Sequence, residues 1–321
     1  MSGTERDSLT EGTPDFTDEP LEGPPPLSPG RELVPGYAVL EHLHRSAKFD
    51  VYDVWSEARF CRCIAKVPIP VSPEDVTEQE LRDFERSSRS LVREFRLLER
   101  LTHPHIVRAY ELLRGESPVL VMETLTGQTL SHLMDTAPRR LPLADLTHLG
   151  LQLCSAVAYL HTKGVLHLDL KPSNVVSERG TAKLLDLSIA RPPGPCRPGL
   201  GTLYYLSPEQ ARGGEVTAAT DVWGVGATLF EAATDEPPFY ADEESEEWEE
   251  SSSEHVSGTE TARRADYEQL RRRADPVGRK RRLPREFSEA IDACLEPDPA
   301  SRPTLRELAR RLETFAGSRG Y

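Results

Sequence analysis

The sequence predicts an α+β protein with two lobes, in which a strand-rich first half precedes a helix-rich second half. Short runs of β-branched and aromatic residues recur up to residue 123, and longer apolar runs with helical spacing follow Gly127. With 321 residues the chain can form one large domain or two, with an ample core in either case. Folds of this kind place their ligands in the cleft between the lobes.

The first half is expected to contain short strands and one major helix. The strands are the runs at residues 37–40, 51–55, 63–67, 106–110 and 119–123. Ser72-Pro73-Glu74-Asp75 predicts the start of the helix, because it offers a cap, a first-turn proline and acids near the positive end of the helix dipole. We expect this helix to run towards Leu101 and to end before Pro104.

The second half is expected to be mainly helical. Runs with helical spacing occupy residues 143–161, 217–233, 286–296 and 303–316. The first of these runs ends near Gly164, directly before a polar loop. We find no internal repeat.

The net charge of −14 is concentrated in two segments. Residues 1–30 hold seven acids and one arginine, and residues 241–260 hold nine acids with no lysine or arginine. The rest of the chain is therefore nearly neutral, and we expect the two acidic segments not to pack. The prolines at 24–26 and Pro29 favour an extended polyproline conformation in the first segment.

The cysteine pattern and the hydropathy of the chain indicate the cellular compartment in which we expect the protein. The five cysteines are odd in number and scattered, so they predict neither a disulfide framework nor a zinc site. The N-terminus lacks a basic-then-apolar leader, and no apolar run approaches the length of a membrane span. We therefore expect a soluble, cytoplasmic protein without a membrane span.

Two short segments carry the chemistry, His167-Leu-Asp-Leu-Lys-Pro-Ser-Asn174 and Leu184-Leu-Asp-Leu-Ser188. A hard metal ion that holds a triphosphate needs oxygen ligands, and Asn174 and Asp186 supply an amide carbonyl and a carboxylate. The two residues are twelve positions apart, a span that suits a short hairpin. Asp169 is placed to accept a proton from an attacking hydroxyl. Because loops are rich in Asp and Asn, two solvated turns are the alternative for these segments alone.

Both segments resemble the catalytic and metal-binding loops of the eukaryotic-type (Hanks-type) serine/threonine protein kinases, and we expect a soluble bacterial member. The resemblance implies a protein-kinase-like fold over residues 35–316, with a β-rich N-lobe at 35–124 and a helical C-lobe at 125–316. We expect a disordered acidic and proline-rich tail at 1–34. We also expect an acidic insert at 241–262.

The resemblance implies binding of ATP and Mg²⁺. Lys66 would hold the α- and β-phosphates, and Glu94 would fix this lysine by an ion pair. Asp169 would be the catalytic base, and Asn174 and Asp186 would be the metal ligands.

Lys171 and Thr202 would clamp Asp169 and the γ-phosphate, which favours serine or threonine as the acceptor. Backbone groups of Glu123 and Leu125 would bind the edge of the adenine. The residues expected to sandwich its faces are Leu43, Val51, Ile64 and Val176.

Three further residues are expected to be structural. Arg302 would pair with Glu209, and Asp221 would support the catalytic loop from below. The segment from Gly201 to Glu209 also separates the chain from aminoglycoside-type phosphotransferases, which share only the Asp-x-x-x-x-Asn core.

The sequence departs from the family pattern in the turn that covers the phosphates. Residues 43–51 contain no glycine, although the family places three there, and any left-handed residue would be strained. Our hypothesis is that Arg45 or Lys48 contacts phosphate through its side chain.

Two other departures concern regulation. Leu168 replaces the arginine that usually pairs with an activation-loop phosphate, and residues 191–201 contain no serine, threonine or tyrosine. We therefore predict an enzyme that is not switched by phosphorylation in this stretch. Ser188 replaces the glycine of the metal motif and should restrict the backbone, which would hold Asp186 inward.

The expected activity is phosphorylation of serine or threonine in protein substrates. The alternatives are a pseudokinase scaffold, favoured by the missing glycines, and a small-molecule phosphotransferase. A basic block at residues 263–282 is too local to indicate nucleic acid. It is either a solvated helix or a surface that the acidic insert masks by charge pairing. The sequence predicts no oligomeric state.

Overall fold

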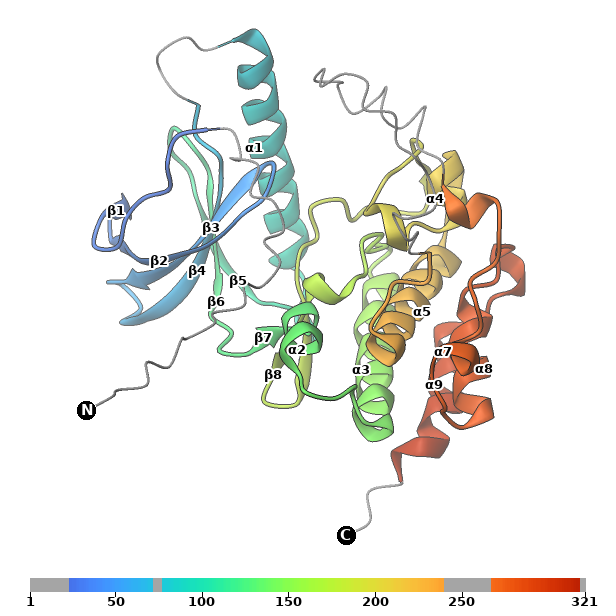
Figure 1. Ribbon diagram of the computed structural model, residues 1–321. Helices are drawn as coiled ribbons and strands as arrows, with labels where there is room; N and C mark the ends of the chain where they lie inside the picture. The colour runs from blue at the N-terminus through green and yellow to red at the C-terminus, as the bar shows by residue number, and fades with distance from the viewer. Residues whose placement is uncertain (1–22, 72–76, 240–266, 318–321) are drawn as a thin grey trace, which may run out of the picture. The chain divides into compact units, whose positions relative to one another are not determined.

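The computed structural model describes residues 23–71, 77–239 and 267–317 (Figure 1). The chain divides into two compact units, one formed by residues up to 89 with 113–119, the other by residues 90–112 with those from 120 onward. The first part of the chain forms β1 Glu32–Val34, β2 Tyr37–Arg45, β3 Phe49–Ser56, β4 Cys61–Pro68, α1 Glu78–Leu98, β5 Ala109–Leu113 and β6 Val119–Glu123. The α+β class is confirmed.

The remaining elements follow the strand-rich part, as the sequence predicts. They are β7 Gln128–Thr129, α2 Leu130–Thr136, α3 Leu143–Thr162, β8 Val175–Glu178, β9 Thr181–Leu184, β10 Gly194–Pro195, α4 Pro208–Arg212, β11 Glu215–Val216, α5 Ala218–Thr234, α7 Val277–Lys280, α8 Arg285–Cys294 and α9 Leu305–Ala316.

In the first unit, β1 to β4 pair in sequence order, each antiparallel to the next. β2 is longer than the predicted strand at 37–40, because it continues through mostly polar residues that still pair with β3. Alternation of apolar and polar residues does not reveal such a continuation, since pairing depends on the backbone of the partner strand.

The segment before β1 packs against the same sheet. Leu27 N donates to Tyr52 Oη at 3.1 Å, and Gly30 N donates to Val39 O at 2.8 Å. Val39 N in turn donates to Arg31 O at 2.8 Å. The expected disordered tail therefore does not extend to residue 34, because the end of this segment satisfies its backbone groups on the sheet. Residues 1–22 lie outside the described residues.

In the part of the chain that the structure describes, helix α1 begins with a cap at Thr77. Thr77 Oγ1 accepts a hydrogen bond from Glu80 N at 3.2 Å, and Glu80 Oε2 accepts one from Thr77 N at 2.8 Å, which is a complete capping box. The expected start at residues 72–75 lies outside the described residues. The helix ends at Leu98, three residues before the predicted Leu101, and the chain leaves it in tight turns.

The predicted strand at 106–110 is wrong in its position. Ile106 forms only an isolated parallel bridge with Leu184, and Val107 N donates to Leu184 O at 3.0 Å. The ladder of β5 starts at Ala109. The apolar run thus reflects burial of Ile106 and Val107 rather than strand pairing.

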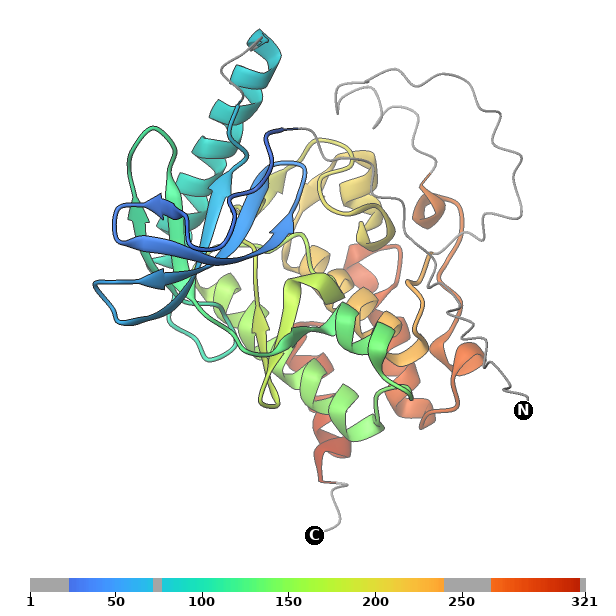
Figure 2. The same ribbon diagram turned by 60° about the vertical axis from the view of Figure 1, so that its left-hand side comes forward.

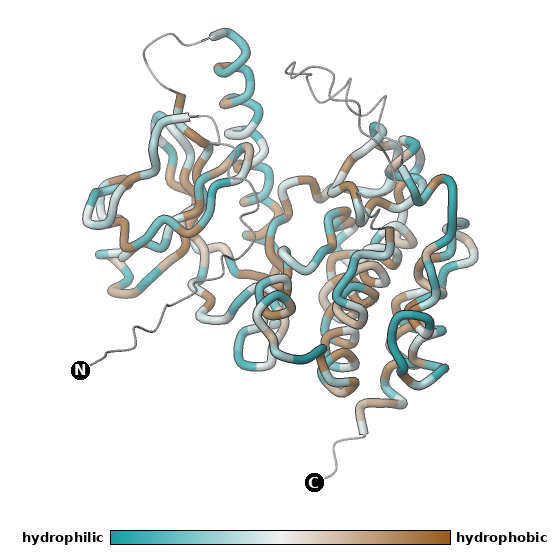
Figure 3. The backbone as a smooth tube through the Cα atoms, in the orientation of Figure 1, coloured by the Kyte–Doolittle hydropathy of each residue, from teal (hydrophilic) through white to brown (hydrophobic). Residues whose placement is uncertain are grey.

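The second unit is built around helix α5. It contacts α3 and α8, and α3 also contacts α9 (Figures 1 and 2). Of the 17 residues of α5, 14 are buried, and the hydropathy view shows it apolar over much of its length (Figure 3). A helix that is apolar on all sides belongs in a core. A Cβ on Gly226 would lie 2.4 Å from Cys294 Cβ, so this glycine permits the close approach of α5 and α8.

The two compact units differ from the lobes expected at 35–124 and 125–316. The second half of α1 belongs to the second unit, because its polar side chains bind residues 187 and 188 of that unit. Most of β6 also belongs there, and Glu123 N donates to Arg108 O at 2.9 Å.

The acidic insert at 241–262 lies outside the described residues. Within the described part, several cations of the basic block already have acidic partners. The pairs are Arg272–Glu268, Arg273–Glu296, Arg279–Asp275 and Lys280–Glu236. Charge pairing between the acidic insert and the basic block stays a hypothesis. The four ion pairs already formed by the basic block would compete with such pairing.

Candidate active site

Asp169 lies at the centre of a hydrogen-bonded group in the second unit. Its Oδ1 accepts a hydrogen bond from Thr202 Oγ1 at 2.7 Å, and Thr202 Oγ1 accepts one from Lys171 Nζ at 2.7 Å. Lys171 Nζ also lies 3.4 Å from Asp169 Oδ2. Asn174 Nδ2 donates to Asp169 O at 2.8 Å and to Asp169 Oδ2 at 3.1 Å. The arrangement leaves a carboxylate oriented by a cation, a hydroxyl and an amide.

The backbone before Asp169 is strained and supported from below. Leu168 has φ of 68°, a left-handed conformation that costs a leucine about 1–3 kcal/mol. Asp221 on α5 compensates, since its Oδ2 accepts from His167 N at 2.9 Å and its Oδ1 from Leu168 N at 2.8 Å. Its Oδ2 also lies 2.8 Å from His161 Nε2. The expected support of the catalytic loop by Asp221 is confirmed.

Asn174 and Asp186 flank the open end of a hairpin. β8 and β9 pair with Val175 opposite Leu184, and Leu185 N donates to Asn174 O at 2.9 Å (Figure 1). The hairpin that the spacing of twelve residues suggests is confirmed. Asp186 has φ of 53°, and its Oδ1 accepts a hydrogen bond from Ser188 N at 2.9 Å.

These residues suit a magnesium ion by the chemistry of their donors. Because Asn174 Nδ2 donates to Asp169, the amide carbonyl oxygen remains as the donor for a cation. Together with the carboxylate of Asp186 it forms a hard oxygen pair, and Mg²⁺ usually takes one or two such protein ligands and otherwise phosphate and water. Within the described residues, no group of three or more His, Cys, Asp or Glu side chains is arranged to hold a metal.

The second half of α1 is tied to the segment that follows Asp186. Glu94 Oε1 accepts a hydrogen bond from Leu187 N at 3.1 Å. The carbonyl of Ser188 accepts hydrogen bonds from Ser90 Oγ at 3.1 Å and from Arg93 Nη2 at 2.8 Å. Sequence reasoning selected Glu94 but missed Ser90 and Arg93. The three contacts restrain the backbone around Ser188.

Lys66 lies in the first unit, on β4. It is directly opposite Val51 on β3, and Ile64 lies two residues earlier on the same face. The ammonium of Lys66 is 4.7 Å from the centre of the Phe49 ring. Leu43 lies in a bulge of β2 and is 47% exposed. Val51, Ile64 and Lys66 therefore lie on one face of the sheet.

The expected adenine-edge segment is fixed by an ion pair that the sequence did not indicate. Glu123 Oε1 accepts hydrogen bonds from Arg108 N at 2.9 Å and from Lys183 Nζ on β9 at 2.6 Å. Leu125 lies two residues after the end of β6. Val176 is buried on β8, opposite Lys183. The backbone at Glu123 is thus joined to the hairpin that Asn174 and Asp186 flank.

The glycine-free turn contains no left-handed residue. No residue from 43 to 51 has a positive φ, so the strain expected there does not arise. Ser46 organises the turn, since its Oγ accepts hydrogen bonds from Lys48 N at 3.3 Å and Phe49 N at 3.1 Å. Ser46 N donates to Phe49 O at 2.9 Å. A side-chain acceptor thus takes over the role expected of glycine.

The segment after Asp186 is held by apolar packing and by one buried amide. Leu168 packs in a buried cluster with Leu166, Leu200 and Val216. Gln210 Nε2 donates to Leu168 O at 2.8 Å and to Leu200 O at 2.7 Å. The leucine that replaces the family arginine therefore holds this segment by burial. Sequence reasoning missed Gln210, for which a buried polar residue in a helix cap is the only signal.

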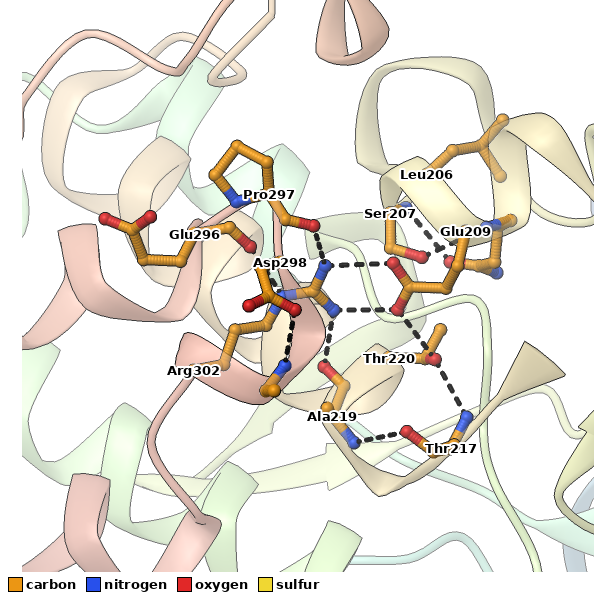
Figure 4. Close-up of polar contacts among 12 residues, drawn as sticks. Leu206, Ser207, Glu209, Thr217, Ala219, Thr220, Glu296, Pro297, Asp298 and Arg302 are labelled. Atoms are coloured by element: carbon orange, nitrogen blue, oxygen red, sulfur yellow. Dashed lines mark hydrogen bonds and ion pairs between the residues drawn. The ribbon is translucent and has the colours of Figure 1, made fainter. Parts of the chain in front are cut away.

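Arg302 and Glu209 form the expected pair, in a dense network (Figure 4). Nη1 donates to Glu209 Oε1 at 2.7 Å and Nη2 to Oε2 at 2.9 Å. The guanidinium also donates to the carbonyls of Ala219, Glu296 and Pro297. Burial alone would raise the pKa of Glu209, but the hydrogen bonds and charge of Arg302 outweigh it and hold this pKa below its usual value.

Comparison with known proteins identifies the family. Residues 74–312 match the model of the protein kinase domain, which is well over half of the chain. The chain therefore belongs to the protein kinase family. The matched range is shorter than the expected 35–316 and begins after the glycine-free turn and β4.

The relatives that the comparison finds include bacterial serine/threonine-protein kinases. PkaA of Streptomyces coelicolor is 35% identical over 236 residues, which are 70% of this chain and 39% of that protein. PknB of Mycolicibacterium smegmatis is 38% identical over 161 residues, 44% of this chain and 25% of that protein. PknB of Mycobacterium tuberculosis is 36% identical over 155 residues, again 44% and 25%. The chain thus spans 25–39% of the length of these relatives.

Among the helices of the described part, none combines the length and apolarity that crossing a membrane requires.

Proposed function

We propose that this chain transfers the γ-phosphoryl group of Mg-ATP to serine or threonine hydroxyls of protein substrates. The observation that carries the proposal is the group of Asp169, Lys171, Thr202 and Asn174. A carboxylate held in this way can accept the proton of an attacking hydroxyl. The names of the relatives support a serine or threonine acceptor.

The residues of this chain divide the work of transfer. Asp169 orients the acceptor hydroxyl and takes its proton, and Lys171 balances the charge near the transferred group. Asn174 and Asp186 would hold Mg²⁺, which when bound neutralises charge on the phosphate oxygens. Lys66 would bind the α- and β-phosphates, with Glu94 as its ion-pair partner.

The nucleotide base would be held by the residues expected for it. Backbone groups of Glu123 and Leu125 would bind its edge. Leu43, Val51, Ile64 and Val176 would contact its faces. The ion pair between Glu123 and Lys183 supports this assignment, because it fixes the strand that carries the edge-binding groups. A reaction of ATP with proteins is also consistent with a cytoplasmic site of action.

The test is a radiolabelled-ATP assay with a protein acceptor, on the wild type beside Asp169→Asn and Asp186→Asn. We expect label on serine or threonine with the wild type and a loss of at least about 100-fold with either variant. Asp275→Asn is the matched control, because this exposed carboxylate pairs with Arg279 on the surface.

The other two functions give different outcomes in the same assay. Nucleotide binding without transfer by the wild type would identify a scaffold rather than an enzyme. Label on a metabolite and not on protein would identify a small-molecule phosphotransferase. Full transfer by Asp169→Asn would reject the role of Asp169 as base.

A further inference from the structure

The glycine-free hairpin contains a buried carboxylate that the proposed reaction does not use. Asp50, on β3, is 0% exposed and lies directly opposite Arg45 on β2. Its Oδ1 accepts a hydrogen bond from Arg45 Nε at 2.7 Å and its Oδ2 one from Arg45 Nη2 at 2.7 Å. His42 Nε2 lies 2.9 Å from Oδ1. The carboxylate thus has partners on both of its oxygens.

The pair fixes the two strands at the point where they enter the turn. A planar guanidinium that binds both carboxylate oxygens allows a single relative orientation. The side chain of Arg45 is only 9% exposed, and removing either partner would leave the other charge buried. Residues 46–48 therefore start from a rigid base, and Ser46 closes the turn above it.

The segment before β1 encloses the pair from another side. A Cβ on Gly23 would lie 2.7 Å from Ile69 Cγ2 and 3.8 Å from Arg45 Nη1. Tyr52, two residues after Asp50, accepts the hydrogen bond of Leu27 N. Arg45 is thus packed between the sheet and a proline-rich segment.

This environment makes Arg45 unsuited to bind phosphate directly. Its Nε and Nη2 are both engaged by Asp50, and the aspartate raises the pKa of Arg45 through these hydrogen bonds. Lys48, in contrast, is exposed at the tip, and within residues 23–71 no ion pair of its ammonium is formed.

We infer that Asp50 and Arg45 are positioning residues for the nucleotide: they hold the turn at residues 46–48 in one shape, so that its backbone amides and Lys48 can meet the phosphates without glycine. The inference rests on the proposed function. Preorganisation of this kind lowers the entropic cost of binding. The pair therefore acts on affinity for Mg-ATP rather than on the chemical step.

The test compares variants in the full chain. For each one, the Kd for Mg-ATP, the KM for ATP, the kcat and the urea midpoint are measured. We expect Asp50→Asn and Arg45→Ala each to raise Kd and KM about tenfold, with kcat changed less than about threefold. The double variant should bind Mg-ATP no more weakly than either single variant, because the two residues act as one unit.

Two controls separate positioning from general loss of stability. Asp53→Asn removes another buried aspartate on β3, whose partner Arg62 lies on β4, away from the turn. It should lower the urea midpoint similarly and leave KM within about twofold. Ser46→Ala removes the hydroxyl that accepts from the amides of Lys48 and Phe49 and donates to Phe49 O, so it should fold normally and raise KM about threefold.

Opposite results would overturn the inference. If Arg45 bound phosphate itself, Asp50→Asn would release it, and the variant would keep or improve its affinity while Arg45→Ala lost affinity. Reduced stability with unchanged Kd and KM in both variants would leave the pair a purely structural role. If the wild type binds Mg-ATP but transfers no phosphate, the proposed function is rejected and the inference is still tested. In that case the Kd values of the variants alone show whether the pair positions the turn. A wild type that binds no Mg-ATP would remove both.

Discussion

Replacing Arg302 with methionine should strongly destabilise the second unit. The side chain of Arg302 is 0% exposed and that of Glu209 10% exposed, so the variant leaves a carboxylate largely cut off from water. The Thr220 hydroxyl at 2.9 Å and the backbone amide of Glu209 remain as donors to this carboxylate, and the carbonyls of Ala219, Glu296 and Pro297 lose their donor. Breaking a buried pair from one side costs about 3–5 kcal/mol, a large part of a typical total of about 5–15 kcal/mol.

Urea unfolding followed by tryptophan fluorescence measures this loss. The guanidinium of Arg302 lies 4.9 Å from the centre of the buried Trp223 ring, so the transition is observed where the change is made. Arg273→Met is the matched control, because Arg273 is 70% exposed and pairs with Glu296 at the surface. The control should cost less than about 1 kcal/mol.

The same variant gives a pH test with a definite sign. Arg302 holds the pKa of Glu209 below its ordinary value, so the pair stabilises the wild type above that value and the stabilisation is lost as pH falls through the lowered pKa. In Arg302→Met, burial dominates and raises this pKa, so protonation of Glu209 at low pH removes the buried charge that destabilises the variant. The difference in unfolding free energy between the wild type and Arg302→Met should therefore be smaller at pH 4 than at pH 7. A gap of less than about 1 kcal/mol at pH 7, or one that does not change with pH, would refute the reasoning.

Three further predictions concern other parts of the second unit. Leu168→Arg places an unpaired charge in an apolar cluster and should cost more than about 3 kcal/mol in urea unfolding, against about 1 kcal/mol for Leu168→Met. Asp221→Asn removes one acceptor below the left-handed Leu168 and should lower kcat at least about tenfold with little change in the KM for ATP, as steady-state assays would show. Burial and the charge of His105 lower the pKa of His103. As pH falls through the ordinary histidine range, the unfolded chain binds a proton at this residue more readily than the folded protein does, so the folded protein loses stability. His103→Phe, which keeps a ring against Tyr159, should lose less stability between pH 7 and pH 5 in the same unfolding assay.

Much of the candidate site could be predicted because its members are close in sequence or belong to a recognisable motif. Asp169, Lys171 and Asn174 lie within six residues, and the hairpin that follows needs only a short turn, formed by Arg179 and Gly180 with positive φ. The distant pair of Glu209 and Arg302 was predicted by family resemblance alone. No spacing rule joins residues that are 93 positions apart.

Polar side-chain pairs that are particular to this chain could not be predicted. In the sequence, Asp50 is indistinguishable from an ordinary polar residue at the start of a strand. Its burial depends on Arg45 of the neighbouring strand and on the segment at residues 23–27. The ion pair between Glu123 and Lys183 likewise depends on where β9 lies relative to β6. Such pairs require the tertiary structure, because the sequence gives the charge of a side chain and not the distance to its partner.

The same argument applies to element boundaries. Residues 41–45 are mostly polar and none is fully buried, yet they belong to β2, because their backbone pairs with β3. Ile106 and Val107 are apolar and buried, but they contact β9 without forming a ladder. Burial and pairing are separate properties, and hydropathy reports only the first.

The leucine cluster around Leu168 has a consequence for how the cell governs such an enzyme. The segment is held by apolar contacts and has no hydroxyl between residues 189 and 201, so we predict that phosphorylation within this stretch does not switch the protein. Control of its output would then act outside this stretch, on the amount of protein present or on its encounters with a target.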